Sequence, residues 1–366
     1  MTFSMQPDTA PTTLQATGGA PYPVVVGTGL HEHVGPLLDD TATRVALIHP
    51  PALAAAARRI AGDLERHGRQ VLELVVPPGE SAKDAGVLVY LWSRLAEVGF
   101  TRGDAVVAVG GGATTDLAGF LAATWQQGLR LVLVPSTLLG MVGASVAGRG
   151  SLNVPQGKNL VGALHRPAGV VCDLDLLATL PLPEYVGGLA EVVKAGLIAD
   201  PALLDLIEAD PRAAADPAGG RTAELVEGAV RAKSALLGTD PLAGGPREFL
   251  DYGHTLGHAV EHAEGYRIRH GHAVSIGMVY AAELAHAAGR LSAPHVLRHR
   301  TVLESLGLPT SYPRHAWERL RASLGADGTA RGGRLRFVVL DAPGRPGLLQ
   351  GPDPELLQAA WARVGG

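Results

Sequence analysis

Cysteine, basic runs and long apolar segments are almost absent from this chain of 366 residues. The single cysteine, Cys172, excludes a disulfide framework and suits a reducing compartment. No apolar run reaches the roughly 18 residues that a membrane-spanning helix needs. Residues 1–21 are polar and turn-rich, without a charged segment followed by an apolar one, so no signal peptide is expected. These absences predict a cytoplasmic protein without a membrane partner.

Charge is nearly balanced along the chain. The formal net charge is −4, and no basic run of five or more residues occurs. Both features argue against a phosphate-backbone partner such as DNA. Hydrophobic residues make up 46% and charged residues 18%, as in globular proteins, and the length allows two domains. We therefore expect a small-molecule substrate and no nucleic-acid partner.

The first half of the chain alternates short apolar runs with helical stretches. Residues 51–67 and 84–98 show helical patterns. The apolar runs are Val24–Val26, Val45–Ile48, Val71–Val75, Ala105–Val109 and Leu131–Val134. Alternation of this kind, with nearly continuous apolar strands, predicts a parallel sheet covered on both faces.

The residue composition and the hydrophobic periodicity of the sequence change near residue 178. From there Ala, Leu, Glu and His dominate and helical periodicity continues nearly to the end. The pattern predicts a flexible N-terminus over residues 1–20, a nucleotide-type α/β domain over 21–177 and an all-helical domain over 178–366. Within the second domain, residues 214–220 are rich in Pro, Gly and Asp and are expected to form a loop.

A glycine-rich turn follows one of the predicted strands. Gly110–Gly112 ends a buried strand and opens a helix that includes Asp116. Glycines let the backbone approach a ligand closely, and a helix N-terminus offers N–H groups to a pyrophosphate. Taken alone, such a turn has a purely structural role about as often as it binds a ligand. It also does not match the GxGxxG dinucleotide motif. Two further segments favour nucleotide binding: the hydroxyls of Pro135–Thr137 at a strand end, and Pro78–Lys83, which could otherwise be a capped helix start.

Histidines and a carboxylate form a second pattern. His254 and His258 lie four residues apart on one helix face, and His270 follows twelve residues later. Glu191 and Lys194, three residues apart, also share a face. Two imidazoles, one carboxylate and an open position form the usual catalytic zinc arrangement. Because the chain has 14 histidines, chance pairing stays about as well supported as a metal site.

Several of these segments resemble 3-dehydroquinate synthase and the related sugar-phosphate cyclases in order and spacing. The similarity covers roughly residues 20–360. Its motifs are Gly110–Gly119, Pro135–Leu139, Gly157–Asn159, Gly188–Lys194 and Gly253–His258. The resemblance implies a Rossmann-like parallel-sheet domain that binds NAD, a helical domain that binds a metal, a homodimer and carbon–oxygen lyase or cyclase activity.

The resemblance also assigns roles to individual residues. It implies that Glu191, His254 and His270 bind a divalent metal, with Zn or Co favoured over Mg because two ligands are imidazoles. By position, the contacts to NAD would come from Glu80, Lys83, Gly111, Gly112, Asp116 and Thr137. Substrate would be held by Lys158, Asn159, Lys194, Lys233, Arg247 and His258. In the family, NAD oxidises an alcohol held on the metal, phosphate leaves, the ketone is reduced again and aldol closure gives a carbocycle.

The chain departs from the family pattern where the substrate phosphate binds. Gln127 stands where the family has Arg, Arg149 where it has a catalytic-loop Lys, and Asp251 where it has Asn. Gly143 replaces an Asp near the nicotinamide. An acidic residue is replaced by Ala243, and a Lys pair by Gly328 and Thr329.

These replacements predict weak binding of a phosphate. A carboxylate at Asp251 beside a phosphate dianion would cost on the order of several kcal/mol at an effective dielectric near 20. That cost is enough to erase micromolar binding. Arg for Lys at position 149 is not conservative where a point charge is needed. Because the metal set and Lys194 remain, loss of all activity by drift explains the pattern poorly.

The leading hypothesis from sequence is therefore a dehydroquinate-synthase-like cyclase or lyase of specialised, natural-product metabolism. It would use a divalent metal and NAD for enolisation, elimination or aldol-type ring closure on a non-phosphorylated or atypical substrate. Lys194 or His258 would shuttle protons, and Arg149 would take a new anionic group. The alternatives are an authentic 3-dehydroquinate synthase of the shikimate pathway and a non-catalytic binding or regulatory homologue. A simple alcohol dehydrogenase is disfavoured by Gly157–Asn159 and Gly188–Lys194.

Overall fold

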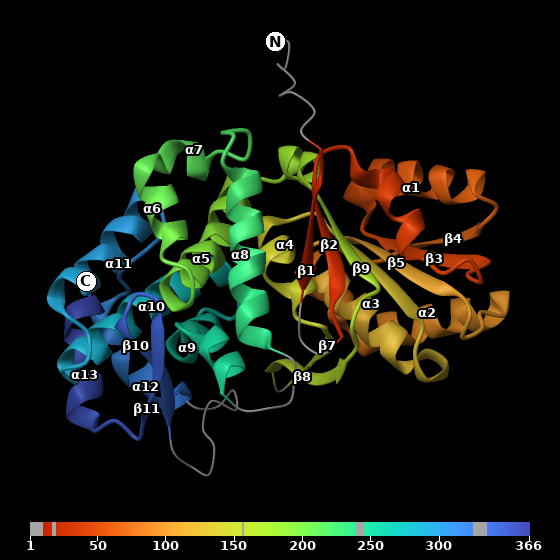
Figure 1. Cartoon of the computed structure of the whole chain (residues 1–366). Coiled ribbons are helices and arrows are strands. Elements are labelled where there is room, and N and C mark those ends of the chain that lie inside the picture. The colour runs from red at the N-terminus through yellow and green to blue at the C-terminus, as the bar shows by residue number, and fades with distance from the viewer. Residues whose placement is uncertain (1–9, 17–19, 156, 239–244, 325–334) are drawn as a thin grey trace. The chain divides into compact units, whose positions relative to one another are not determined.

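The computed structural model describes residues 10–16, 20–155, 157–238, 245–324 and 335–366 (Figure 1). The chain divides into two compact units, Met1–Leu180 and Pro181–Gly366, which are described separately below. The sequence predicts the change of domain between residues 177 and 178, three residues before the end of the first unit. Among the described residues, no helix combines the length and the apolar character that crossing a membrane requires.

A seven-stranded sheet forms the centre of the first unit, in the order β1-β2-β9-β6-β5-β3-β4. In this spatial order, every neighbouring pair from β2 through β9, β6, β5 and β3 to β4 is parallel, which confirms the expected parallel sheet. All five apolar runs identified in the sequence are strands. The bounds are β1 Thr12–Ala16, β2 Tyr22–Gly27, β3 Arg44–His49, β4 Gln70–Val75, β5 Ala105–Gly110, β6 Arg130–Pro135 and β9 Gly169–Asp173.

The edge strand β1 corrects the expectation of a flexible segment over residues 1–20. Thr12–Ala16 pairs antiparallel with β2, from Thr12 opposite Val26 to Ala16 opposite Tyr22. An edge strand has only one hydrogen-bonding neighbour and needs little apolar surface of its own. The polar composition of β1 therefore lacks the apolar run by which the other strands were predicted.

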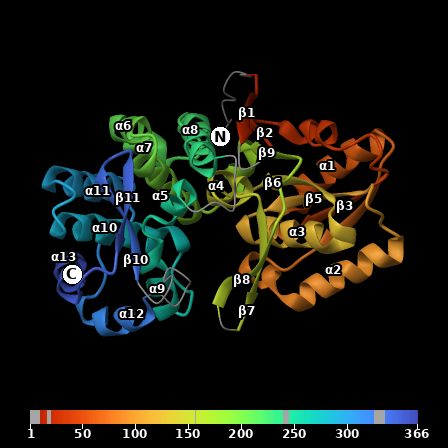
Figure 2. The ribbon, with the colours of Figure 1, turned by 60° about the horizontal axis from the view of Figure 1, so that its bottom comes forward.

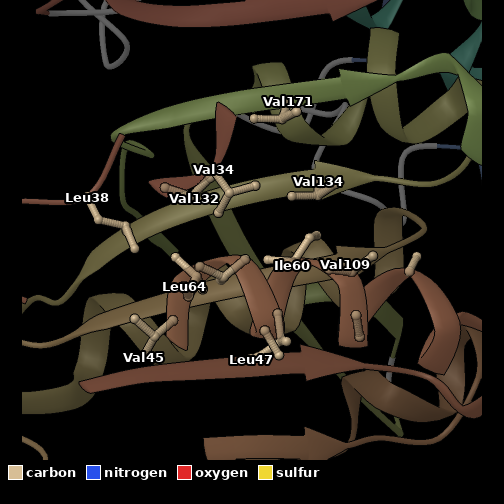
Figure 3. Close-up of a cluster of buried hydrophobic side chains, with 14 of the residues drawn as sticks. Val34, Leu38, Val45, Leu47, Ile60, Leu64, Val109, Val132, Val134 and Val171 are labelled. Carbon is tan, nitrogen blue, oxygen red and sulfur yellow. The ribbon is translucent and has the colours of Figure 1, made fainter. Parts of the chain in front are cut away.

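Helices cover both faces of this sheet, as near-continuous apolar strands require. On one face, Ile60 and Leu64 of α1 pack against Val45, Leu47 and their neighbours (Figure 3). On the other face, α3 packs on β5 and β6 (Figure 2). The helices of the unit are α1 Ala54–Arg66, α2 Ala85–Val98, α3 Gly112–Thr124 and α4 Leu138–Val142. Short 3₁₀ turns are η1 Leu30–His33, η2 Gly35–Leu37, η3 Pro51–Leu53, η4 Gly79–Lys83, η5 Trp125–Gln127, η6 Ala144–Val146 and η7 Leu174–Thr179.

A separate hairpin, β7 Arg149–Val154 and β8 Gly157–Leu164, runs beside α3. The approach is very close, because a Cβ added to Gly150 would meet the backbone nitrogen of Phe120 at 2.0 Å. A Cβ on Gly119 would likewise meet the backbone oxygen of Arg149 at 3.0 Å. Glycines on both elements therefore allow the hairpin to lie against the helix that carries Asp116.

The second unit is mainly helical and is organised around α10. This helix is buried along most of its length and contacts α5, α9, α11, α13 and β10. The helices are α5 Leu182–Ile198, α6 Ala202–Ala209, α7 Pro211–Ala215, α8 Thr222–Leu237, α9 His254–Ala263, α10 His270–Ala287, α11 Ala293–Ser305, α12 Trp317–Ser323 and α13 Pro354–Val364. Two 3₁₀ turns are η8 Pro246–Asp251 and η9 Arg314–Ala316. The loop expected over residues 214–220 starts later than predicted, because α7 continues to Ala215.

A two-stranded antiparallel hairpin corrects the expectation that this unit is all-helical. It consists of β10 Arg336–Ala342 and β11 Arg345–Gln350. The apolar stretch Phe337–Leu340 is fully buried. A short apolar run of this kind cannot be assigned to a strand or a buried helix from periodicity alone. Packing against α10 decides the outcome.

Candidate functional site

Helix α5 buries a carboxylate and an ammonium group side by side. Glu191 is 8% exposed and Lys194 is 4% exposed. Lys194 Nζ lies 2.8 Å from Glu191 Oε1 and 2.7 Å from Glu191 Oε2. Buried charges are costly unless they are paired or bind a metal. The spacing of three residues inferred from sequence therefore places both groups on one helix face, as expected.

Three histidines lie close to this carboxylate. His254 is the first residue of α9, and His258 follows one turn later, with the two ring centroids 5.0 Å apart. His270 is the first residue of α10, and its ring centroid lies 5.3 Å from that of His254. His254 Nε2 is 4.0 Å and His270 Nε2 is 3.9 Å from Glu191 Oε1. One ligand atom from each of Glu191, His254 and His270 lies within 4.8 Å of the others, as a metal site requires.

Glycines set the spacing of the three helices that carry these residues. A Cβ on Gly271 would meet the backbone oxygen of Gly187, on α5, at 1.8 Å. A Cβ on Gly277 would meet the backbone oxygen of Gly253 at 1.9 Å, and Gly253 has a left-handed φ of 81°. Both crossings are therefore backbone against backbone. The first places the start of α10 beside α5, and the second places the start of α9 beside the middle of α10.

The protonation states suit a metal. Burial is the main cause that lowers the pKa of His254 well below its ordinary value, and Lys194, His258 and His270 lower it further. For Glu191, burial acts to raise the pKa, but Lys194, His270 and Lys233 outweigh burial and hold it below its usual value. A neutral imidazole and an ionised carboxylate are the forms that bind metal ions.

Glu261 is a member of the cluster that sequence reasoning missed. It lies on α9 seven residues after His254, is 3% exposed, and its Oε2 is 3.3 Å from His270 Nδ1. With His258 and His270 it forms a second group whose ligand atoms lie within 4.8 Å of one another. The spacing of 254, 258 and 261 along one helix face was the available signal.

The other residues of this unit that are predicted to contact substrate differ in solvent exposure. Lys233, on α8, is close enough to influence the pKa of Glu191. Arg247 and Asp251 lie in η8, which Tyr252 and Gly253 separate from α9, and Asp251 is exposed. Ala243, Gly328 and Thr329, singled out as departures, lie outside the described residues.

In the first unit, the glycine turn and the hydroxyl turn are neighbours. Gly110 and Pro135 are paired residues at the carboxyl ends of β5 and β6. A Cβ on Gly111 would lie 3.2 Å from Thr137 Cγ2. Thr137 Oγ1 accepts a hydrogen bond from the backbone nitrogen of Gly140 at 2.9 Å and caps α4. Open parallel sheets bind ligands at this edge. The structure thus brings the turn of Gly111 and Gly112 close to Thr137.

A buried lysine organises the neighbouring polar residues. Lys83 is 2% exposed, donates to Asp116 Oδ2 at 2.7 Å, and is also hydrogen-bonded to Asn159 Oδ1. Ser151 Oγ, which sequence reasoning missed, lies 3.0 Å from Asp116 Oδ2 and 2.8 Å from Asn159 Oδ1. Glu80 Oε2 accepts from the side chain of Asn153 at 2.6 Å. The hairpin β7–β8 is therefore tied to η4 and α3 through predicted NAD and substrate residues.

The residues of this unit that depart from the family pattern are a glycine in a tight turn and two exposed side chains. A Cβ on Gly143 would meet the backbone oxygen of Leu139 at 2.4 Å, so the turn after α4 is fitted to glycine. Arg149, at the start of β7, and Gln127, after α3, are exposed. Lys158, on β8, is half-buried. Arg149, Lys158 and Asn159 thus share one hairpin, whereas the metal cluster belongs to the other unit.

Comparison with known proteins covers both units. The family model for the 3-dehydroquinate synthase N-terminal region matches residues 73–186, and the model for the C-terminal region matches residues 188–329. A protein of Thermobifida fusca named 3-dehydroquinate synthase is 55% identical over 346 residues, 94% of this chain and 94% of its own length.

Two solved structures are similar over nearly the whole chain. A 2-deoxy-scyllo-inosose synthase, complexed with carbaglucose-6-phosphate, NAD⁺ and Co²⁺, has a TM-score of 0.86 at 25% identity and covers 96% of this chain and 100% of that chain. ValA, a 2-epi-5-epi-valiolone synthase from Streptomyces hygroscopicus subsp. jinggangensis with NAD⁺ and Zn²⁺ bound, has a TM-score of 0.85 at 26% identity, covering 96% and 98%.

Proposed function

The chain belongs to the 3-dehydroquinate synthase family, and from that premise we propose that it is a metal- and NAD-dependent cyclase that forms 3-dehydroquinate. The observation that carries the proposal is the cluster of the buried Glu191 with the half-buried His254 and His270 on three separate helices. The relative from Thermobifida fusca, at 55% identity, favours this activity over the specialised-metabolism cyclase that led the hypotheses from sequence.

The donor set of the cluster fits a divalent metal of borderline softness. Two imidazole nitrogens and one carboxylate oxygen suit Zn or Co better than Mg, which prefers oxygen ligands. When bound, such a metal supplies Lewis-acid polarisation of a substrate hydroxyl or ketone. Glu191, His254 and His270 would hold it. In the solved relatives with similar folds, the bound metals are Co²⁺ and Zn²⁺.

The residues beside the cluster are suited to handle charge and protons. The ammonium of Lys194, in contact with Glu191, would stabilise an oxyanion on substrate held at the metal ligands. His258 is half-buried beside the ring of His254 and would hold or release a proton at its imidazole. Lys233, Arg247 and Asp251 would orient the polar groups of the substrate.

The first unit is suited to bind NAD at the carboxyl edge of its sheet. Gly111 and Gly112 would let the backbone at the start of α3 approach a pyrophosphate, and no side chain of the N-cap residue Gly111 caps that helix N-terminus. Lys83 and Asp116 hold the adjacent polar wall in place. Glu80 and Thr137 complete the proposed set, with Lys158, Asn159 and Arg149 proposed to contact substrate. NAD would supply a hydride acceptor.

The test is phosphate release from the seven-carbon keto-sugar phosphate used by the family. Purified full-length protein is incubated with this substrate, NAD and Co²⁺ or Zn²⁺. We expect turnover that a chelator abolishes and added metal restores. Replacement Glu191→Ala is expected to lower the rate at least about 100-fold, because it removes a metal ligand. His262→Ala, an exposed change on the same helix α9, is the control.

One set of observations favours a second candidate, a cyclase that acts on a non-phosphorylated or atypical substrate. Gly143 is fitted to its turn and leaves no room for the family Asp without backbone movement. Asp251 adds a carboxylate where phosphate is expected. Protein that binds metal and NAD but releases no phosphate, and instead converts an unphosphorylated polyol or ketone, would establish this candidate.

We also propose that the chain forms a homodimer, as the family resemblance implies. Light scattering of the purified protein should then give about twice the 37.8 kDa of one chain. A mass of a single chain at micromolar concentration would contradict this assembly.

A further inference from the structure

We propose that Glu261 is a positioning residue for the metal centre, which accepts a hydrogen bond from Nδ1 of His270 and so directs Nε2 of that ring toward Glu191. The inference rests on the proposed metal-binding function of Glu191, His254 and His270. Glu261 itself is not among those ligands, and no residue motif in the sequence assigned it a role.

The two nitrogens of the His270 ring face two different carboxylates. Nε2 lies 3.9 Å from Glu191 Oε1, and Nδ1 lies 3.3 Å from Glu261 Oε2. A neutral imidazole has one N–H donor and one acceptor nitrogen. With the proton on Nδ1, the ring donates to Glu261 and its Nε2 lone pair faces the metal position. The other tautomer would set a lone pair against the Glu261 carboxylate. Glu261 therefore selects the tautomer that can bind a metal.

His270 needs such a fixed partner more than His254 does. The His270 side chain is 29% exposed, whereas that of His254 is 14% exposed. Both residues begin a helix, so no preceding helical turn packs against either ring, and the difference between them is their exposure. Packing alone therefore restrains this ligand weakly, and a hydrogen bond supplies the missing restraint.

Glu261 is well placed to supply that restraint. It is 3% exposed and lies on α9 seven residues, or two turns, after His254, so both side chains share one helix face. The helix that provides one metal ligand thus also orients another. A buried carboxylate is retained when its charge is used in hydrogen bonds or beside cations. A divalent ion bound by His270 would polarise the Nδ1–H group and strengthen its bond to Glu261.

A competing arrangement would make Glu261 a metal ligand. Glu261, His258 and His270 also have ligand atoms within 4.8 Å of one another. Binding there would need His270 Nδ1 as the ligand, which requires loss of its proton and of the hydrogen bond. If both sites were filled, one ring would bridge two divalent cations, which repel each other strongly at that separation. The geometry therefore favours one metal per chain, and the number of metals bound decides between the two arrangements.

The experiment measures zinc directly rather than turnover. The Zn²⁺ content per chain and the Zn²⁺ dissociation constant, by competition with a chromophoric chelator, are determined for the full-length wild type, Glu261→Leu, Glu261→Gln, Glu191→Ala and His262→Ala. Leucine fills the buried volume without an acceptor, so the fold is retained. We expect one zinc per chain and a loss of affinity of about 10–100-fold for Glu261→Leu. Glu261→Gln should lose less than about tenfold, because its amide oxygen still accepts the Nδ1 hydrogen.

The outcomes separate the inference from the proposed function. His262→Ala should bind zinc as the wild type does, and Glu191→Ala should bind none. If Glu261→Leu melts at a lower temperature but binds zinc with unchanged affinity, Glu261 is only structural and the inference is wrong. Two zinc ions per wild-type chain, with one lost in Glu261→Leu, would make Glu261 a ligand and also overturn it. A wild type that binds no zinc would refute the metal site itself.

Discussion

The backbone oxygen of Gly187 lies 1.8 Å from the point where a Cβ on Gly271 would stand. Helices α5 and α10 therefore touch backbone to backbone. Gly271 follows His270 directly, and Gly187 precedes Glu191 by about one helical turn. Because Gly271 has no side chain, the two helices can approach this closely. That approach sets the distance between the Glu191 carboxylate and the His270 imidazole.

Replacement of Gly271 by Ala should weaken the metal centre. The added methyl group forces α10 away from α5, an overpacking that costs about 1–3 kcal/mol or more. It also moves His270 relative to Glu191. We expect a lower melting temperature and at least about a tenfold loss of Zn²⁺ affinity, measured by thermal unfolding and chelator competition.

Gly187→Ala is the matched control at the same crossing. A Cβ on Gly187 itself would meet nothing within 4 Å. Alanine also favours a helix over glycine by up to about 1 kcal/mol. This variant should therefore keep the metal affinity and melt no lower than the wild type. Equal effects of the two substitutions would contradict the account of the crossing.

Removal of the metal should lower the stability of the second unit. The proposed ligands come from α5, α9 and α10, so a bound ion links three helices. A ligand present at 100 times its dissociation constant stabilises the folded state by about 2.7 kcal/mol. We expect the melting temperature to fall on chelation and to recover with Zn²⁺. In Glu191→Gln the recovery should vanish; a zinc-dependent rise that persists in this variant would place the ion elsewhere.

Loss of the buried lysine in the first unit should be costly. In Lys83→Met the carboxylate of Asp116 loses its 2.7 Å partner, and breaking a buried ion pair costs about 3–5 kcal/mol. Urea unfolding should show this loss, and NAD affinity measured by calorimetry should fall as well. The double variant Lys83→Met/Asp116→Leu should be less destabilised than the sum of the single variants. Additive effects would show that the two side chains are not coupled.

Restoring the family residue at position 143 should fail. In Gly143→Asp the new Cβ meets the backbone oxygen of Leu139, so the turn after α4 must shift. We expect destabilisation of about 1–3 kcal/mol in urea unfolding and no gain in NAD affinity. Arg149→Lys restores another family residue at an exposed position and should leave stability within about 0.5 kcal/mol. Higher NAD affinity in Gly143→Asp would show that the turn readily accommodates a side chain.

The buried pair of His299 and Tyr252 should make stability depend on pH. Burial lowers the pKa of His299 from 6.5 to about 4, with the charges of His295 and Arg298 as lesser causes. The Tyr252 hydroxyl lies 2.9 Å from His299 Nε2, and His299 Nδ1 lies 2.7 Å from the backbone oxygen of His295. Both bonds suit a neutral ring. Below pH 6.5 the unfolded chain takes up a proton that the folded chain rejects until about pH 4, so stability falls as pH falls through this window.

The size of this effect can be measured in one variant. Between pH 7.5 and pH 5, His299 should account for a loss of about 2 kcal/mol in the free energy of unfolding. His299→Gln keeps a donor and an acceptor but does not titrate. Its unfolding free energy, measured in urea at several pH values, should therefore fall less on acidification than that of the wild type. The same slope in both proteins would exclude His299 as the cause.

Local patterns in the sequence were sufficient for much of the architecture. The apolar runs that became β2, β3, β5 and β6 are buried on both faces, and that environment leaves a continuous apolar pattern. The turn Gly110–Gly112 and the pair His254 and His258 are also local, because their spacing along the chain fixes their spacing in space. Two strands were not recognised, although each pairs with the next strand along the chain. β1 is a polar edge strand, and the short apolar run of β10 does not distinguish a strand from a buried helix.

The sequence by itself determined which residue types are present for a metal and a nucleotide, and on which elements they lie. Only the tertiary structure decided that Glu261 faces His270, that Ser151 joins Asp116, and that Gly271 lies against Gly187. Each of these contacts joins two different elements: α9 and α10, β7 and α3, and α10 and α5. Their distances follow from how helices and strands pack, and the backbone contacts between α5, α9 and α10 set that packing.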